Sequence, residues 1–142
     1  MRILLFLTVL LCSFFSAHAA EPLPSARAPH PLTGSWSWTL PGKSCTEQLH
    51  YRANGTRQGS SGEETTKSSY EVTALPSLMA FYRLSETVTD SNGKRDCSGD
   101  LHNATGEPVI RFIQFSPKKD QLIICREETL KACFGPLKRL PG

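Results

Sequence analysis

The sequence predicts an all-β protein: a single antiparallel meander of seven or eight strands, closed or nearly closed as a barrel and held by two disulfides. Short segments alternate polar and apolar residues with a period of two, turn-forming residues separate these segments, and four cysteines follow the N-terminal leader. No segment repeats apolar residues at helical spacing, and only residues 127–132 are expected to form as much as one helical turn. A closed barrel is favoured over a sandwich because closure removes unpaired edge strands.

The N-terminus has the three-part pattern of a secretory signal peptide. Arg2 precedes an apolar run over residues 3–15, and the small residues Ala17 and Ala19 follow it. The run is shorter than the ~20 apolar residues of a membrane-spanning helix. We therefore expect cleavage after Ala19, no transmembrane segment, and a secreted or periplasmic protein. Cys12 follows leucines rather than small residues, which disfavours the alternative of a lipid-modified cysteine.

Residues 20–32 are rich in proline and alanine, which predicts an extended arm before a barrel domain over residues 33–142. The first strand is expected over residues 35–40, because apolar side chains recur there at every second position. These side chains should share the inward face: Trp36, Trp38 and Leu40.

Turn-forming residues predict where the later strands reverse. Asn-Gly pairs at residues 54–55 and 92–93 indicate two tight hairpins, because this dipeptide adopts the positive φ angles that such turns need. Residues 116–120 indicate a third reversal between two apolar runs. The polar residues 59–67 are expected to be a mobile loop or a polar strand end.

Four cysteines remain beyond the leader, and an even number in an exported chain indicates two disulfides: Cys45, Cys97, Cys125 and Cys133. Seven residues separate Cys125 from Cys133, and residues 126–131 are polar enough to reverse the chain, so that these two cysteines meet across neighbouring strands. That leaves Cys45 to pair with Cys97, closing a loop of about 50 residues. The alternative joins Cys45 to Cys133, if closure of the barrel places the first and last strands side by side.

Residues 32–36 read Leu-Thr-Gly-Ser-Trp, and Arg139 lies close to the C-terminus. This Gly-x-Trp start resembles the first strand of lipocalins and their calycin relatives, which are small β-barrels. The resemblance implies that Trp36 seals one end of the barrel and that Arg139 packs over it. The chain departs from the lipocalin pattern in having no clear helix before its final strand and no second lipocalin motif.

Two charged residues are expected to point into the barrel. By strand alternation, Glu47 shares a face with Cys45 and Tyr51, and Arg111 lies among the apolar residues of 109–115. A buried carboxylate is costly unless it is paired, so we expect Glu47 to pair with Arg111. With Tyr51, they would then line a ligand-binding cavity. The alternatives are a purely structural salt bridge, or a strand whose two faces are assigned the wrong way round.

Catalytic and metal-binding patterns are missing from the sequence. It contains no Gly-x-Ser-x-Gly elbow, His-Glu-x-x-His motif, phosphate loop or CxxC pair, so we predict neither an enzyme nor a cofactor or metal site. His30, His50 and His102 are expected to be solvated surface histidines. Cleavage after Ala19 leaves 15 basic and 13 acidic residues, a balance that does not favour nucleic acid as a partner.

These observations predict an exported, non-enzymatic binding module whose ligand is an unknown small molecule or protein. One alternative is a secreted or periplasmic enzyme inhibitor that presents residues 60–66 as a loop. Another is a structural envelope protein. An apolar cavity of several hundred Å³ would favour a small molecule, whereas a filled core with a protruding loop would favour a protein partner.

Overall fold

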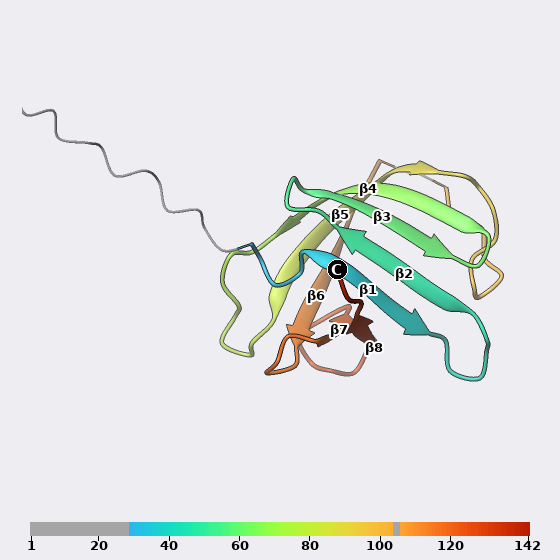
Figure 1. Cartoon of the computed structure of the whole chain (residues 1–142). Coiled ribbons are helices and arrows are strands. Elements are labelled where there is room, and N and C mark those ends of the chain that lie inside the picture. The colour runs from blue at the N-terminus through green and yellow to red at the C-terminus, as the bar shows by residue number, and fades with distance from the viewer. Residues whose placement is uncertain (1–28, 104–105) are drawn as a thin grey trace, which may run out of the picture.

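The computed structural model describes residues 29–103 and 106–142, so the predicted signal peptide lies outside the described residues. Eight antiparallel strands follow one another around a closed barrel, and the last strand pairs with the first (Figure 1). The predicted fold class is confirmed. The strands are β1 (Gly34–Thr39), β2 (Thr46–Tyr51), β3 (Thr56–Ser61), β4 (Glu64–Val72), β5 (Tyr82–Ser91), β6 (Pro108–Phe115), β7 (Gln121–Cys125) and β8 (Cys133–Arg139).

No helix occurs in the described residues, and residues 127–132, the one segment that offered a helical turn, connect β7 to β8 without one. The described residues accordingly offer no helix of the length and apolarity needed to cross a membrane.

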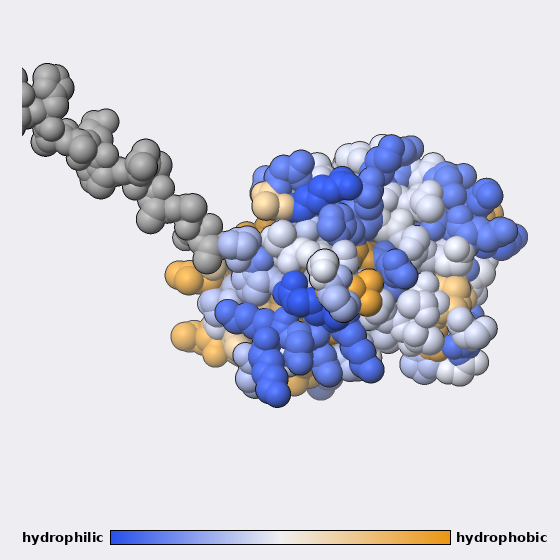
Figure 2. Space-filling view, viewed as in Figure 1, coloured by the Kyte–Doolittle hydropathy of each residue, from blue (hydrophilic) through white to orange (hydrophobic). Residues whose placement is uncertain are grey.

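The apolar core fills the half of the barrel in which β1 begins. Alternate residues of each strand point into it, because successive side chains of a strand face opposite sides. The core consists of Leu32, Trp36, Tyr51, Tyr70, Leu84, Ile113, Leu122, Ile124 and Leu137. The outward-facing residues are mostly polar, and the face seen in Figure 2 is mainly hydrophilic with small, separate apolar patches. This division between faces is the one that period-two alternation predicts.

Trp36 and Arg139 seal this end of the barrel. Trp36 is fully buried, and its Nε1 donates a hydrogen bond of 2.8 Å to the carbonyl of Leu32. The guanidinium carbon of Arg139 lies 4.1 Å from the Trp36 ring centroid, where the lipocalin resemblance places a basic residue. Arg139 also donates to the backbone carbonyls of Pro31 and Thr33. Leu32, from the segment expected to be an arm, is itself fully buried in the core.

Both disulfides lie at the opposite end of the barrel, and both predicted pairings are confirmed. Cys45 and Cys97, with Cα atoms 5.6 Å apart, join the β1–β2 connection to residues 92–107 between β5 and β6. Cys125 and Cys133, with Cα atoms 4.0 Å apart, face each other across β7 and β8. The two bridges therefore brace the end of the barrel that Trp36 does not close.

The predicted turns at residues 54–55 and 116–120 are confirmed, since each joins two neighbouring paired strands. The tight hairpin at 92–93 was wrong, because a long connection over residues 92–107 follows β5 instead. The Asn92 side chain is held by the backbone of the β3–β4 turn: its Oδ1 accepts from the Thr65 N–H, and its Nδ2 donates to the Glu63 carbonyl.

The polar residues 59–67 belong to the paired strands β3 and β4, so the mobile-loop reading was wrong and the strand reading holds. Ser61 lies opposite Glu64, and the turn between them contains only Gly62 and Glu63. Gly62 has a φ of +60°, a conformation that glycine adopts without steric penalty. Apolar alternation did not reveal these strands because their inward residues are mainly polar.

Candidate functional site

The half of the barrel beyond the core encloses a cavity of about 420 Å³. Its apolar walls come from β2, β5, β6, β7 and β8, and they are formed by Leu49, Leu84, Val88, Val109, Ile124 and Phe134. Charged and polar side chains occupy the floor and the mouth. The connection over residues 92–107 contributes Asp96, His102 and Asn103 to the lining. The result is a mostly apolar space with a small number of ionisable groups.

A buried ion pair forms part of the cavity lining next to the core. Arg57 Nη2 lies 2.8 Å from Glu86 Oε1, and the two side chains are only 9% and 17% exposed. Tyr51, a core residue, donates its phenol hydrogen to Glu86 Oε2 over 3.3 Å. Burial, reinforced by the charge of Glu86, raises the pKa of Tyr51, so the phenol remains protonated and continues to donate. The ion pair offsets the cost of burying both charges, but it leaves Arg57 Nε buried without a hydrogen-bond partner.

Gly59 makes room for Arg57. A Cβ atom at position 59 would lie 2.6 Å from Arg57 Nη1 and 2.9 Å from Thr66 Oγ1, which is closer than Cβ contacts in proteins allow. The guanidinium therefore passes over the glycine and reaches Thr66 and Ser68 as well as Glu86. The sequence analysis missed Arg57 and Glu86. In the structure Tyr51 lies opposite Arg57, which places Arg57 on the inward face. A two-residue turn at 54–55 would instead pair position 51 with position 58, so the Asn-Gly motif alone gave no signal that Arg57 points inward.

All three residues predicted to bind a ligand, Glu47, Tyr51 and Arg111, line the cavity. The predicted pairing of Glu47 with Arg111 was wrong. Glu47 Oε1 accepts a hydrogen bond of 2.7 Å from Ser61 Oγ, and Arg111 Nη1 donates to the Ile110 carbonyl over 2.9 Å. The physical reason is topological, because β2 and β6 lie four positions apart around the eight-stranded barrel, on opposite walls, whereas Ser61 lies directly opposite Glu47 on the neighbouring strand.

Glu64 is the most unusual side chain at the cavity mouth. Only 10% of the side chain is exposed, and its Oε1 is buried without a hydrogen-bond partner. His102 Nδ1 lies 3.6 Å from this oxygen, beyond hydrogen-bond distance. Burial raises the pKa of Glu64; Asp96 adds to this effect, and His102 opposes it.

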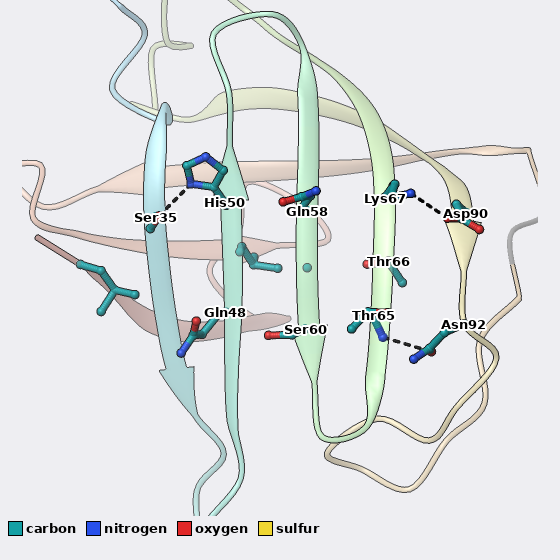
Figure 3. Close-up of a pocket in the computed structure, with 13 residues that line it drawn as sticks. Ser35, Gln48, His50, Gln58, Ser60, Thr65, Thr66, Lys67, Asp90 and Asn92 are labelled. Carbon is teal, nitrogen blue, oxygen red and sulfur yellow. Dashed lines mark hydrogen bonds and ion pairs between the residues drawn. The ribbon is translucent and has the colours of Figure 1, made fainter. Parts of the chain in front are cut away.

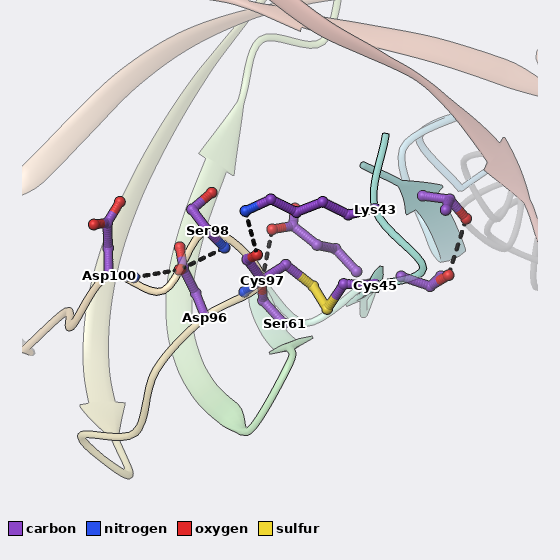
Figure 4. The surroundings of a disulfide bond; sticks show 10 residues. Lys43, Cys45, Ser61, Asp96, Cys97, Ser98 and Asp100 are labelled. Carbon is purple, nitrogen blue, oxygen red and sulfur yellow. Dashed lines mark hydrogen bonds between the residues drawn. A yellow bond between two sulfur atoms is a disulfide. The ribbon is translucent and has the colours of Figure 1, made fainter. Parts of the chain in front are cut away.

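The disulfide Cys45–Cys97 holds Asp96 at the same mouth (Figure 4). Lys43 Nζ donates to the Cys97 carbonyl over 3.0 Å, and the Cys97 N–H donates to Ser61 Oγ over 3.0 Å. Asp96 Oδ1 accepts hydrogen bonds of 2.8 Å from two backbone N–H groups, those of Ser98 and Asp100. This part of the connection is therefore fixed to the barrel through several independent contacts.

A second, larger hollow of about 680 Å³ lies on the outer face of β1 to β5 (Figure 3). Its lining is polar, and its side chains bind one another. Lys67 pairs with Asp90 at 3.2 Å, and His50 Nδ1 lies 2.8 Å from Ser35 Oγ. Lys67 and Asp90 are both more than 60% exposed. We consider the interior cavity the better candidate site, because it is the one that combines apolar walls with buried charges.

The three histidines occupy different environments. His102 is 58% exposed, as expected of a surface residue, and His50 lines the outer hollow. His30 instead packs edge-on against Tyr82, with ring centroids 4.9 Å apart, and burial lowers its pKa. Across residues 29–103 and 106–142, no group of three or more His, Cys, Asp or Glu side chains has the arrangement of a metal site.

Glu64→Gln is expected to raise the free energy of unfolding at pH 7 by about 1 kcal/mol, because it removes the charge of a carboxylate whose Oε1 is buried without a donor. Because the pKa of Glu64 is raised in the folded state, ionisation of this carboxyl destabilises the fold. This destabilisation is absent below the unfolded-state pKa and is fully present once the pH has risen through the folded-state pKa. The stability gained by Glu64→Gln should therefore be present at pH 7 and vanish at about pH 4.

Urea unfolding at the two pH values tests this expectation. Glu71→Gln is the matched control, because Glu71 belongs to the same strand but is exposed on the outer face. It should show no pH-dependent gain. An equal gain from Glu64→Gln at both pH values would mean that the carboxylate charge is not its source.

The chain matches no protein-family model, no curated protein and no solved structure. The candidate site is therefore defined by its own geometry.

Proposed function

We propose that the mature protein is an exported, lipocalin-like binding protein that holds a small molecule in the open half of its barrel. The observation that carries the proposal is the cavity of about 420 Å³, which lies within the size range of small-molecule pockets. Apolar walls with a few convergent polar groups are the usual composition of such pockets. The eight-stranded meander and the contact between Trp36 and Arg139 support the lipocalin likeness.

Both ends of the cavity are braced by the fold before any ligand binds. Trp36 and the core close it below, and the bridges Cys45–Cys97 and Cys125–Cys133 brace its open end. A preformed site loses less conformational entropy when a ligand binds, so more of the interaction free energy contributes to affinity. Two disulfides also suit a protein that works in an oxidising compartment, which supports export.

The segment that an inhibitor would present as a loop is held in the barrel wall. Residues 60–66 belong to the hairpin of β3 and β4. The N–H groups of Glu63 and Glu64 both donate to the Arg95 carbonyl over 3.1 Å, which ties the turn to the neighbouring connection. This hairpin leaves no free loop for insertion into the cleft of another protein, which favours the small molecule over the inhibitor.

Filling the cavity tests the proposal. Val88 lines it from β5, so Val88→Phe should weaken binding of the neutral fluorescent dye N-phenylnaphthylamine about tenfold or more. Thr87→Phe is the matched control, because strand alternation places position 87 on the outer face. Fluorescence titration of the intact, oxidised protein measures both affinities. Dye binding that Val88→Phe leaves unchanged, or that both variants reduce equally, would reject the proposal.

A retained ligand can be sought directly. Native mass spectrometry of the protein purified from the organism that makes it should show a bound mass of small-molecule size, and Val88→Phe purified in the same way should lack that mass. A bound mass that persists in Val88→Phe would place the ligand outside the cavity.

A further inference from the structure

We propose that the ligand carries a positively charged nitrogen, a protonated amine, and that this group binds Glu64 at the cavity mouth. Asp96 and Glu47 complete the anionic surroundings of the subsite. The inference rests on the proposed function, because it assumes that a small molecule occupies the cavity. It adds the chemical class of that molecule and the side chain that recognises it.

Glu64 lines the cavity and has one carboxylate oxygen without a hydrogen-bond donor. This oxygen is Oε1, and the side chain is nine-tenths buried. Polar atoms in protein interiors are nearly always hydrogen-bonded, because an unsatisfied buried acceptor is costly. An ammonium group supplies both the missing donor and the opposite charge. The raised pKa of Glu64 has the same origin, since burial of its carboxylate outweighs the opposing effect of His102, whose Nδ1 lies 3.6 Å from Oε1.

The other carboxylates at the mouth already have donors. Glu47 Oε1 binds Ser61, and Asp96 Oδ1 binds two backbone N–H groups. Glu47, Ser61 and Glu64 lie side by side across β2, β3 and β4, so the two carboxylates are separated by two strand spacings, about 10 Å. They therefore contribute negative potential at the mouth, and Glu64 contributes the hydrogen bond.

The charges lining the cavity do not balance. Among the described residues, its lining includes four carboxylates, two guanidinium groups and one imidazole: Glu47, Glu64, Glu86, Asp96, Arg57, Arg111 and His102. His102 Nδ1 lies 3.6 Å from Glu64 Oε1 and 3.7 Å from Asp96 Oδ2. Glu86 and Arg57 neutralise each other at 2.8 Å. Arg111 lies on β6 and donates to a carbonyl of its own strand. The remaining acidic excess attracts a cation and repels an anion, and the effect is stronger in a partly enclosed space than in water.

The apolar walls identify the rest of the ligand. Val88, Val109 and Phe134 line the cavity without offering any side-chain hydrogen bond. They suit an alkyl or aromatic body attached to the amine. A divalent cation is the competing occupant of an acidic mouth, but the described carboxylates do not converge as a metal site does.

Three probes of similar shape differ in charge at pH 7: naphthylethylamine is cationic, naphthylethanol is neutral and naphthylacetate is anionic. Isothermal titration calorimetry at pH 7 should show the amine binding about tenfold or more tightly than the alcohol, and the acetate binding more weakly than the alcohol. Glu64→Gln should remove the preference for the amine, so that the amine binds no more tightly than the alcohol. Glu71→Gln, with its charge on the outer face, should leave all three affinities unchanged.

The outcomes distinguish this inference from the proposed function. If the alcohol binds and Val88→Phe blocks it, but the amine has no advantage, the amine inference is overturned and the cavity function stands. If Val88→Phe has no effect on the dye or on any probe, both are overturned. If millimolar calcium binds in a Glu64-dependent manner and displaces the amine, the mouth is a metal site and the inference is overturned.

Discussion

Trp36→Ala is expected to lower the free energy of unfolding by about 3–5 kcal/mol, the range for removing a large buried aromatic side chain. Trp36 has no exposed surface and packs 5.9 Å from the Phe115 ring centroid. The substitution would also leave the Leu32 carbonyl without its donor and Arg139 without the ring beneath it. Since small domains have a total stability of about 5–15 kcal/mol, this loss is a large fraction of the stability of the domain.

Trp38→Ala is the matched control for this prediction. Trp38 is the same residue type on the same face of β1, but it is only partly buried and packs against Phe134, with ring centroids 5.3 Å apart. Its replacement should cost clearly less. Urea unfolding followed by far-ultraviolet circular dichroism compares the two variants. Equal midpoints for Trp36→Ala and the wild type would show that Trp36 does not seal the barrel.

Arg57→Met is expected to lower the free energy of unfolding by a similar amount, about 3–5 kcal/mol, because it leaves the carboxylate of Glu86 buried and unpaired. Glu86→Gln should also destabilise, since it removes the partner of a guanidinium that is only 9% exposed. The double variant should lose much less than the sum of the two single losses, because neither charge is then left alone.

Glu47→Gln and Arg111→Met provide the comparison, since the two side chains line the same cavity but bind different partners. Their effects should add within about 0.5 kcal/mol. Unfolding midpoints for both double-mutant cycles test the assignment. Additive losses for Arg57 and Glu86 would contradict their assignment as an ion pair. Strong coupling between Glu47 and Arg111 would show that these two side chains interact instead.

Local patterns predicted much of the barrel. The alternation around Trp36 and Trp38 and the Asn-Gly turn at residues 54–55 depend on neighbouring residues, so they are readable from the chain alone. The pairing of Cys125 with Cys133 is similar, because only a short reversal separates them. The second Asn-Gly pair, at 92–93, does not form the predicted tight hairpin. The Asn92 side chain hydrogen-bonds instead to Glu63 and Thr65 at the hairpin of β3 and β4, which is distant in sequence.

The sequence by itself determined which face points inward in the strands with apolar alternation, and with it the placement of Glu47, Tyr51 and Arg111 in the lining of the cavity. The physical reason is that side-chain direction alternates along a strand whatever lies next to it. Only the tertiary structure decided which inward residues meet. Closure and register set β3 beside β2 and hold β6 apart from it, so Glu47 binds Ser61, Arg57 reaches Glu86, and Glu64 is left with an unsatisfied oxygen. Whether the barrel interior is filled or hollow depends on the summed side-chain volume at each level, which no single strand reveals.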